Sequence, residues 1–194
     1  MAPGTIARTL GAFAALCVAL PAALAAGSAA APDLQPCAGC HGAGASQSEG
    51  VPSLGGQRAD YVVTQLFQFR EGQREAGPMN EIAAGFSDDD LRTYADAVAL
   101  LPAPTSAGPP PDAALVERAR ALVSKHQCNS CHGGDLTGRD AIPRIRAQRE
   151  DYLATSLAGY KSNARPGYDP AMNEVAQGLN EADIRDLAAY ISRL

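Results

Sequence analysis

Lysine is almost absent from this chain of 194 residues, and positive charge as a whole is in short supply. The only lysines are Lys125 and Lys161, which excludes a lysine-rich ring for docking an acidic partner protein. The chain has 16 basic residues against 21 acidic ones, a formal net charge of −5. Because nucleic acids are bound by basic surfaces, this balance gives no support to nucleic-acid binding.

Long hydrophobic runs are also lacking, apart from one near the N-terminus that extends over residues 10–20. That run is too short to span a bilayer. It lies between Arg8 and the small-residue sequence Ala23-Leu24-Ala25, an arrangement typical of a secretory signal peptide. We therefore predict that residues 1–25 are a cleaved signal peptide, which removes Cys17, and that the protein is located in the bacterial periplasm. Membrane association is expected only through partners or through an uncleaved leader.

The alternation of apolar and polar residues that marks β-strands is almost absent, whereas helical signals are frequent. Ser87 and Asn180 each precede a cluster of acidic residues, as capping residues do at the start of a helix. Apolar side chains recur at helical spacing in five segments, residues 60–71, 88–101, 113–123, 151–161 and 181–194. The predicted fold class is all-α.

Four of the five cysteines and two of the three histidines occur in two copies of the pattern CxxCH, at residues 37–41 and 128–132. This pattern is the attachment site of a c-type haem, because thiols at this spacing reach both vinyl groups and the next imidazole meets the iron. A redox-active CxxC pair or a structural zinc site would not account for a histidine after each second cysteine. We predict two covalently bound haem c groups, held by thioethers to Cys37, Cys40, Cys128 and Cys131, and no structural disulfide.

The axial ligands of the iron follow from the small number of candidates. His41 and His132 belong to the two motifs, and the only methionines after Met1 are Met79 and Met172, one downstream of each motif. A lone methionine is usually a core residue, but both of these have polar or turn-forming neighbours. We therefore predict the ligand pairs His41 with Met79 and His132 with Met172. The remaining histidine, His126, is interpreted as a surface residue near the end of a helix, with replacement of Met172 as the alternative.

The second half of the chain repeats the first. An offset of 91 residues aligns Gln57-Arg58 with Gln148-Arg149 and Asp60-Tyr61 with Asp151-Tyr152, and an offset of 93 aligns Met79-Asn80-Glu81 with Met172-Asn173-Glu174. The chain is therefore an internal duplication, in which the two haem motifs and the two methionines are equivalent. We predict one domain over residues 26–101, a proline-rich linker over 102–111 and a second domain over 112–194.

The two predicted domains differ in charge and at their N-terminal ends. Residues 26–101 carry ten acidic residues and four arginines, a net charge of −6, whereas residues 112–194 carry eleven of each sign. A helix is predicted before Cys128, but Pro32 and Pro36 forbid a long helix before Cys37. Four arginines of the second domain either steer an acidic partner, neutralise haem propionates or form a solvated face: Arg139, Arg144, Arg146 and Arg149.

These residues resemble the dihaem cytochromes c4, exported bacterial electron carriers made of two tandem class I cytochrome c domains. The resemblance rests on both CxxCH motifs, the block Pro52-Ser53-Leu54-Gly55-Gly56-Gln57 and the two Met-Asn-Glu segments, and it covers nearly all of the chain after the leader. The corresponding block of the second half, residues 143–148, matches less well. The resemblance implies His and Met ligation of both irons and haem edges close enough for rapid electron transfer between the domains.

The predicted function is electron transfer between respiratory redox partners, with a donor cytochrome or dehydrogenase and an acceptor oxidase or reductase, and without enzymatic activity. Two methionine ligands leave neither iron open to a substrate. The alternatives are a dihaem enzyme, of the peroxidase or thiosulfate-oxidising type, and a tightly bound electron-transfer subunit of a dehydrogenase or oxidase.

Overall fold

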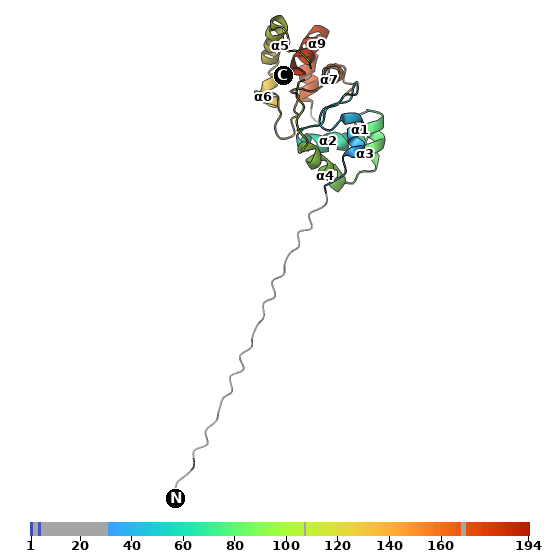
Figure 1. The fold of residues 1–194 in the computed structure, drawn as a ribbon, viewed down its shortest axis with the longest axis vertical. Coiled ribbons are helices and arrows are strands. Elements are labelled where there is room, and N and C mark those ends of the chain that lie inside the picture. Colours follow the sequence, from blue (N-terminus) through green and yellow to red (C-terminus); the bar gives the residue numbers. More distant parts are fainter. Residues whose placement is uncertain (2–3, 5–30, 107, 168–169) are drawn as a thin grey trace. The chain divides into compact units, whose positions relative to one another are not determined.

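The computed structural model describes residues 31–106, 108–167 and 170–194, together with Met1 and Gly4. Nearly all of the predicted signal peptide, and residues 26–30 of the first predicted domain, lie outside the described residues. The helices are α1 (Gln35–His41), α2 (Ala59–Arg70), α3 (Pro78–Ala84), α4 (Asp88–Ala99), α5 (Ala113–Lys125), α6 (Cys128–His132), α7 (Glu150–Ser162), α8 (Ala171–Gln177) and α9 (Glu181–Ile191) (Figure 1).

The all-α prediction is confirmed. Apart from one isolated bridge between Arg139 and Ile142, the described part of the chain contains no β-structure. None of its helices has the length and apolarity that crossing a membrane requires. The five segments with helical periodicity correspond to α2, α4, α5, α7 and α9.

The helix starts that were predicted from the sequence are built by side-chain caps. The Ser87 hydroxyl accepts from the backbone N–H of Asp90, whose carboxylate accepts from the Ser87 N–H, so that a capping box begins α4. Asn180 and Asp183 form the same box at the start of α9. Such a cap satisfies backbone donors that have no partner within the helix and is typically worth about 1 kcal/mol.

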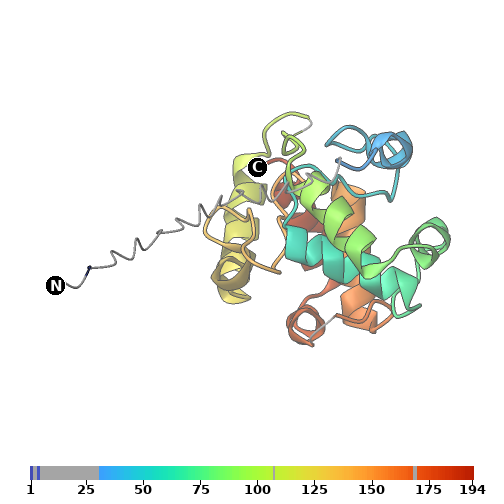
Figure 2. The same cartoon turned by 90° about the horizontal axis from the view of Figure 1, so that it is seen from below.

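Helices pack within each half of the chain rather than between the halves. In the first half α2 packs against α3 and α4, and in the second α7 packs against α8 and α9 while α5 packs against α9. In Figure 1 the labelled helices α5, α6, α7 and α9 lie above α1 to α4, and in the rotated view of Figure 2 the orange and red helices of the second half are seen partly behind the cyan and green helices of the first. The α5–α9 contact includes an ion pair of 2.7 Å between Arg118 Nε and Asp186 Oδ2.

The two halves bury very different amounts of apolar side chain. The second domain has a core cluster of nine buried residues: Ala119, Leu136, Leu153, Leu179, Ile184, Leu187, Ala188, Tyr190 and Ile191. The corresponding cluster of the first domain contains only Val62, Ala95 and Val98. The described residues before α1, 31–34, are not helical, as predicted, and Pro36 lies in the first turn of α1, where proline is tolerated. The first domain therefore has no counterpart of α5 in the described chain and has a small protein core.

The proline-rich stretch between the domains forms neither helix nor strand at residues 102–106 and 108–111. Residues 102–104 nevertheless pack against the first domain. Pro104 is buried, and a Cβ atom placed on Gly55 would lie 2.0 Å from the carbonyl oxygen of Pro102. Only glycine allows this approach, so Gly55 fixes the path of the chain where it leaves the first domain.

Candidate functional site

The two predicted histidine ligands have the same environment in both domains. His41 ends α1 and His132 ends α6, and their exposed fractions are only 8% and 6%. The Nδ1 atom of His41 donates to the carbonyl oxygen of Pro52 at 2.8 Å, and that of His132 donates to the carbonyl oxygen of Pro143 at 2.9 Å. These bonds fix the tautomer and the ring orientation, so that the Nε2 atom of each ring is the one available to bind a metal.

Burial keeps both imidazoles neutral. It lowers the pKa of His41 and of His132, and the hydrogen bonds to the proline carbonyls oppose this effect only in part. A neutral ring is the form that coordinates a metal through nitrogen. The two rings are therefore held in the protonation state and the orientation that iron ligation requires.

The motif cysteines lie on the same short helices as the histidines. Cys37 and Cys40 are three residues apart on α1, and Cys128 and Cys131 occupy the equivalent positions on α6, so each pair faces one side of its helix. All four are free thiols in the structure, with Cys40 and Cys131 exposed. Burial raises the pKa of Cys37 and Cys128.

The two methionines occupy the first turn of equivalent short helices. Met79 lies in α3 and Met172 in α8, and both side chains are half-buried. Sequence periodicity did not identify these helices, because each has only seven residues. Helix α3 packs against α2 and α8 against α7, whereas α1 does not contact α3 among the described helices. The elements that carry the histidine and the methionine of the first domain are thus separate.

An asparagine next to each methionine anchors the methionine helix. The Asn80 side chain donates to the carbonyl oxygens of Phe69, at 2.9 Å, and Arg74, at 2.7 Å, and accepts from the N–H of Ala76 at 2.8 Å. The end of α2 and the segment that follows it are therefore bound, through three backbone groups, to the residue that follows Met79.

Asn173 repeats this anchor in the second domain. Its side chain donates to the carbonyl oxygens of Tyr160 and Arg165 and accepts from the N–H of Gly167. The Met-Asn-Glu repeat was visible in the sequence, but sequence reasoning assigned no role to its asparagines. A polar residue conserved between the two copies beside each methionine was the signal that could have indicated this role.

The remaining histidine, His126, differs from its prediction as a surface residue. It lies at the C-terminal end of α5, is half-buried, and its ring is packed against Gly178 at the end of α8. Its Nε2 atom is buried and has no hydrogen-bond partner in the structure. The prediction failed because the C-terminal end of α5 meets the end of α8, which places the His126 ring beside Gly178.

The residues around the two motifs fit a haem. The first domain buries six apolar residues against eleven in the second, and only three of the six form a cluster, so a large apolar group would complete this small core. In the second domain the Nε atom of Arg144, beside the proline that holds His132, is buried without a partner. Burial lowers the pKa of this guanidinium, and a propionate would supply the missing acceptor.

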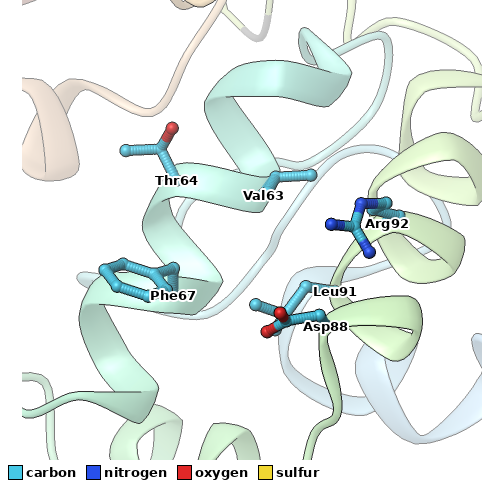
Figure 3. Close-up of a pocket in the computed structure, with 6 residues that line it drawn as sticks. All are labelled: Val63, Thr64, Phe67, Asp88, Leu91 and Arg92. Atoms are coloured by element: carbon cyan, nitrogen blue, oxygen red, sulfur yellow. The ribbon is translucent and has the colours of Figure 1, made fainter.

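A separate groove lies between α2 and α4 of the first domain, as Figure 3 shows. Its lining consists of Val63, Thr64, Phe67, Asp88, Leu91 and Arg92. None of the eight predicted haem-binding residues lines this groove, so it belongs to the surface of the helix pair rather than to the candidate site.

The interface between the domains has an approximate two-fold symmetry. A guanidinium nitrogen of Arg165 donates to the Tyr61 hydroxyl at 3.0 Å, and one of Arg74 donates to the Tyr152 hydroxyl at 3.2 Å. Burial raises the pKa of Tyr61, whereas the positive charges of Arg165 and Arg74 outweigh burial at Tyr152 and lower its pKa. Equivalent residues of the repeat therefore meet across the interface in crossed pairs.

Comparison with known proteins agrees with the geometry. Residues 116–194 match the family model described as Cytochrome c. The thiosulfate dehydrogenase electron acceptor of Stutzerimonas stutzeri is 30% identical over 84% of this chain and 81% of its own length. Cytochrome c4 of Pseudomonas aeruginosa is 29% identical over 81% of this chain and 83% of its own. The structure of reduced recombinant cytochrome c4 from Pseudomonas stutzeri matches with a TM-score of 0.75 and 26% identity, over 83% of this chain and 94% of that one.

The chain belongs to the dihaem cytochrome c4 family. As a member of this family it has two tandem cytochrome c domains and carries covalently bound haem c, one group for each domain. It is an electron-transfer protein and not an enzyme, and its relatives interact with redox partners. The enzymatic alternative is therefore set aside, and the thiosulfate-related relative is itself named as an electron acceptor.

Proposed function

We propose that the protein is a periplasmic electron carrier in which each domain binds one haem through its own cysteines, histidine and methionine. The first domain, residues 26–101, would use Cys37 and Cys40 as thioethers and His41 and Met79 as axial ligands. The second domain, residues 112–194, would use the equivalent set Cys128, Cys131, His132 and Met172. The observation that carries this assignment is the duplicated arrangement, in which each buried histidine donates through Nδ1 to a proline carbonyl and each methionine helix has an asparagine anchor.

Each part of the chain has a distinct task in this function. The haem, when bound, supplies a reversible one-electron couple. The thioethers keep it attached, and the Nδ1 hydrogen bonds hold the histidine rings in one orientation and raise their basicity. The methionine sulfur is a neutral, soft ligand that favours ferrous iron and raises the reduction potential. Asn80 and Asn173 hold the methionine helices in place, so that neither iron has an open position for a substrate.

The redox partners are proposed to be a periplasmic donor and an acceptor that dock on different domains. The net charge of −6 on residues 26–101 favours a basic partner surface there, whereas residues 112–194 are balanced. Because a relative is named as the electron acceptor of thiosulfate dehydrogenase, we propose a thiosulfate-oxidising dehydrogenase as the donor. We expect thiosulfate to reduce the haems only when such a dehydrogenase is present, faster at low salt. Reduction by thiosulfate alone would contradict the carrier function, and no reduction with the dehydrogenase would contradict this donor.

The ligand assignment is tested by a redox titration of the holoprotein, followed by visible spectra with and without carbon monoxide. The wild-type protein should show two low-spin haems that do not bind carbon monoxide. Met79→Ala should open one haem to carbon monoxide and lower one of the two potentials, and Met172→Ala should do the same at the other haem. Carbon monoxide binding by the wild-type protein, or unchanged potentials in both variants, would contradict the assignment.

A further inference from the structure

Each domain inserts the amide of one buried glutamine into the other domain. Gln148, with an exposed fraction of 6%, accepts from the Ser53 N–H at 2.8 Å and donates to the Ser53 carbonyl oxygen at 2.9 Å. Gln57, with an exposed fraction of 7%, accepts from the Arg144 N–H at 2.8 Å and donates to the Arg144 carbonyl oxygen at 3.0 Å. Gln57 and Gln148 are equivalent in the repeat, as are Ser53 and Arg144, so the two contacts are copies of each other.

The backbone groups that the glutamines bind are part of the histidine sites. The N–H of Ser53 belongs to the same peptide unit as the carbonyl of Pro52, which accepts from His41. The N–H of Arg144 belongs to the peptide unit whose carbonyl, on Pro143, accepts from His132. Two hydrogen bonds in series therefore connect each histidine, through a single peptide, to a glutamine of the other domain.

We propose that Gln148 is a positioning residue for the haem ligand His41, and that Gln57 is the positioning residue for His132. This inference rests on the proposed ligation of iron by these histidines. The glutamine Oε1 atom accepts the peptide N–H and so shifts electron density within the peptide toward its carbonyl oxygen, while the amide Nε2 atom donates to the next carbonyl and keeps the peptide from turning. Hydrogen bonds in such a chain polarise one another.

The consequence for the haem has a definite sign. A peptide that donates its N–H to Oε1 has a more negative carbonyl oxygen, which accepts more strongly from the histidine Nδ1–H. The histidine is then a more basic ligand and stabilises ferric iron, which lowers the reduction potential. Because each glutamine belongs to the opposite domain, each domain sets the potential of the haem that it does not bind. Removing the amide of one glutamine should therefore change the potential of the haem in the opposite domain and leave the potential of the other haem unchanged.

The decisive comparison is between Gln148→Leu and its matched counterpart Gln57→Leu in the holoprotein. Gln148→Leu should raise the potential of the first-domain haem, with about a threefold change in its oxidation equilibrium, or about 30 mV at 59 mV per decade. The His41 Nδ1–H resonance in the NMR spectrum of the reduced protein should shift, while that of His132 should not. Gln57→Leu should give the crossed result, with the second-domain haem and His132 affected.

Controls separate this role from a purely structural one. Asp151→Ala removes a different hydrogen bond between the domains, from the Gly50 N–H to Asp151 at 2.8 Å, and should leave the His41 Nδ1–H resonance in place. If Gln148→Leu fails to fold, Gln148→Asn shortens the side chain, keeps a polar amide and should produce the same selective shift. A shift in the haem of the mutated domain, an equal shift in both haems, or no shift in either would overturn the proposal. Failure of the ligand assignment itself is recognised separately, because carbon monoxide would then bind to the wild-type protein.

Discussion

Replacing Asp151 by Asn should weaken the contact between the domains in a manner that depends on pH. The Asp151 carboxylate accepts from the Gly50 N–H of the first domain and forms an ion pair of 2.8 Å with Arg149. The hydrogen bond from Arg149, together with those from the backbone of Gly50 and Tyr152, lowers the pKa of Asp151 from 3.8 to about 2. A lowered folded-state pKa means that the carboxylate stabilises the fold above about pH 4, and that this stabilisation is lost as the pH falls toward 2.

The size of the effect follows from the same pKa shift. A shift of about two pKa units corresponds to at most about 2.5 kcal/mol of differential stability. The Asp151 side chain is 31% exposed, so solvent screening reduces the expected loss to about 1–2 kcal/mol. For a chain of this size that loss corresponds to a decrease in Tm of about 3–6 °C near neutral pH. Near pH 2 the wild-type protein and the Asp151→Asn variant should have the same Tm.

The assay is thermal unfolding of the oxidised holoprotein, followed by circular dichroism at a series of pH values from neutral to acid. Asp60→Asn is the matched control, because Asp60 is the equivalent residue of the first domain and is exposed. It should leave the Tm nearly unchanged. An equal Tm loss in the Asp151→Asn variant at acid and neutral pH, or an equal loss in the control, would show that the Asp151 charge does not stabilise the contact between the domains.

Three further outcomes are expected. Asn80→Ala should release the helix that carries Met79, so that the first-domain haem binds carbon monoxide in optical spectra; a haem that stays inert would show that the anchor is dispensable. Ala147 has a φ of 56°, so Ala147→Gly should raise the free energy of unfolding by up to about 1 kcal/mol in denaturant titrations, whereas Gly56→Ala, at a φ of 60°, should lower it. Cys37→Ala should reduce haem attachment in the first domain. Because the protein core of this domain is small, the domain should also be digested faster by a protease. An unchanged rate of digestion would argue against a core completed by haem.

The parts of this fold that the sequence predicted are those with a local physical cause. The five longer helices have apolar residues at helical spacing, and Ser87 and Asn180 cap helices as their positions indicated. The absence of a helix before α1 followed from the prolines. Both CxxCH motifs could be interpreted because the spacing of the cysteines and histidine is set by the porphyrin and not by the rest of the fold.

The parts that could not be predicted depend on contacts between distant residues. The helices of Met79 and Met172 are too short to show periodicity, and they are held by asparagine hydrogen bonds to the last turns of the preceding helices. Gln57 and Gln148 were aligned in the repeat, but an internal alignment does not show whether a residue contacts its own domain or the other one. The burial of His126 likewise depends on how the end of α5 meets α8.

The reciprocal glutamine contacts give the interface the symmetry of a homodimer. In an isologous contact the same surface is used on both sides, and this is how two identical chains associate about a two-fold axis. Here residue 57 meets 144 while residue 148 meets 53, although all four belong to one chain. A single domain with this surface would have the groups needed to pair with a second copy of itself. The predicted linker, residues 102–111, would hold the two domains at a high effective concentration, so that their association would not depend on the protein concentration in the cell.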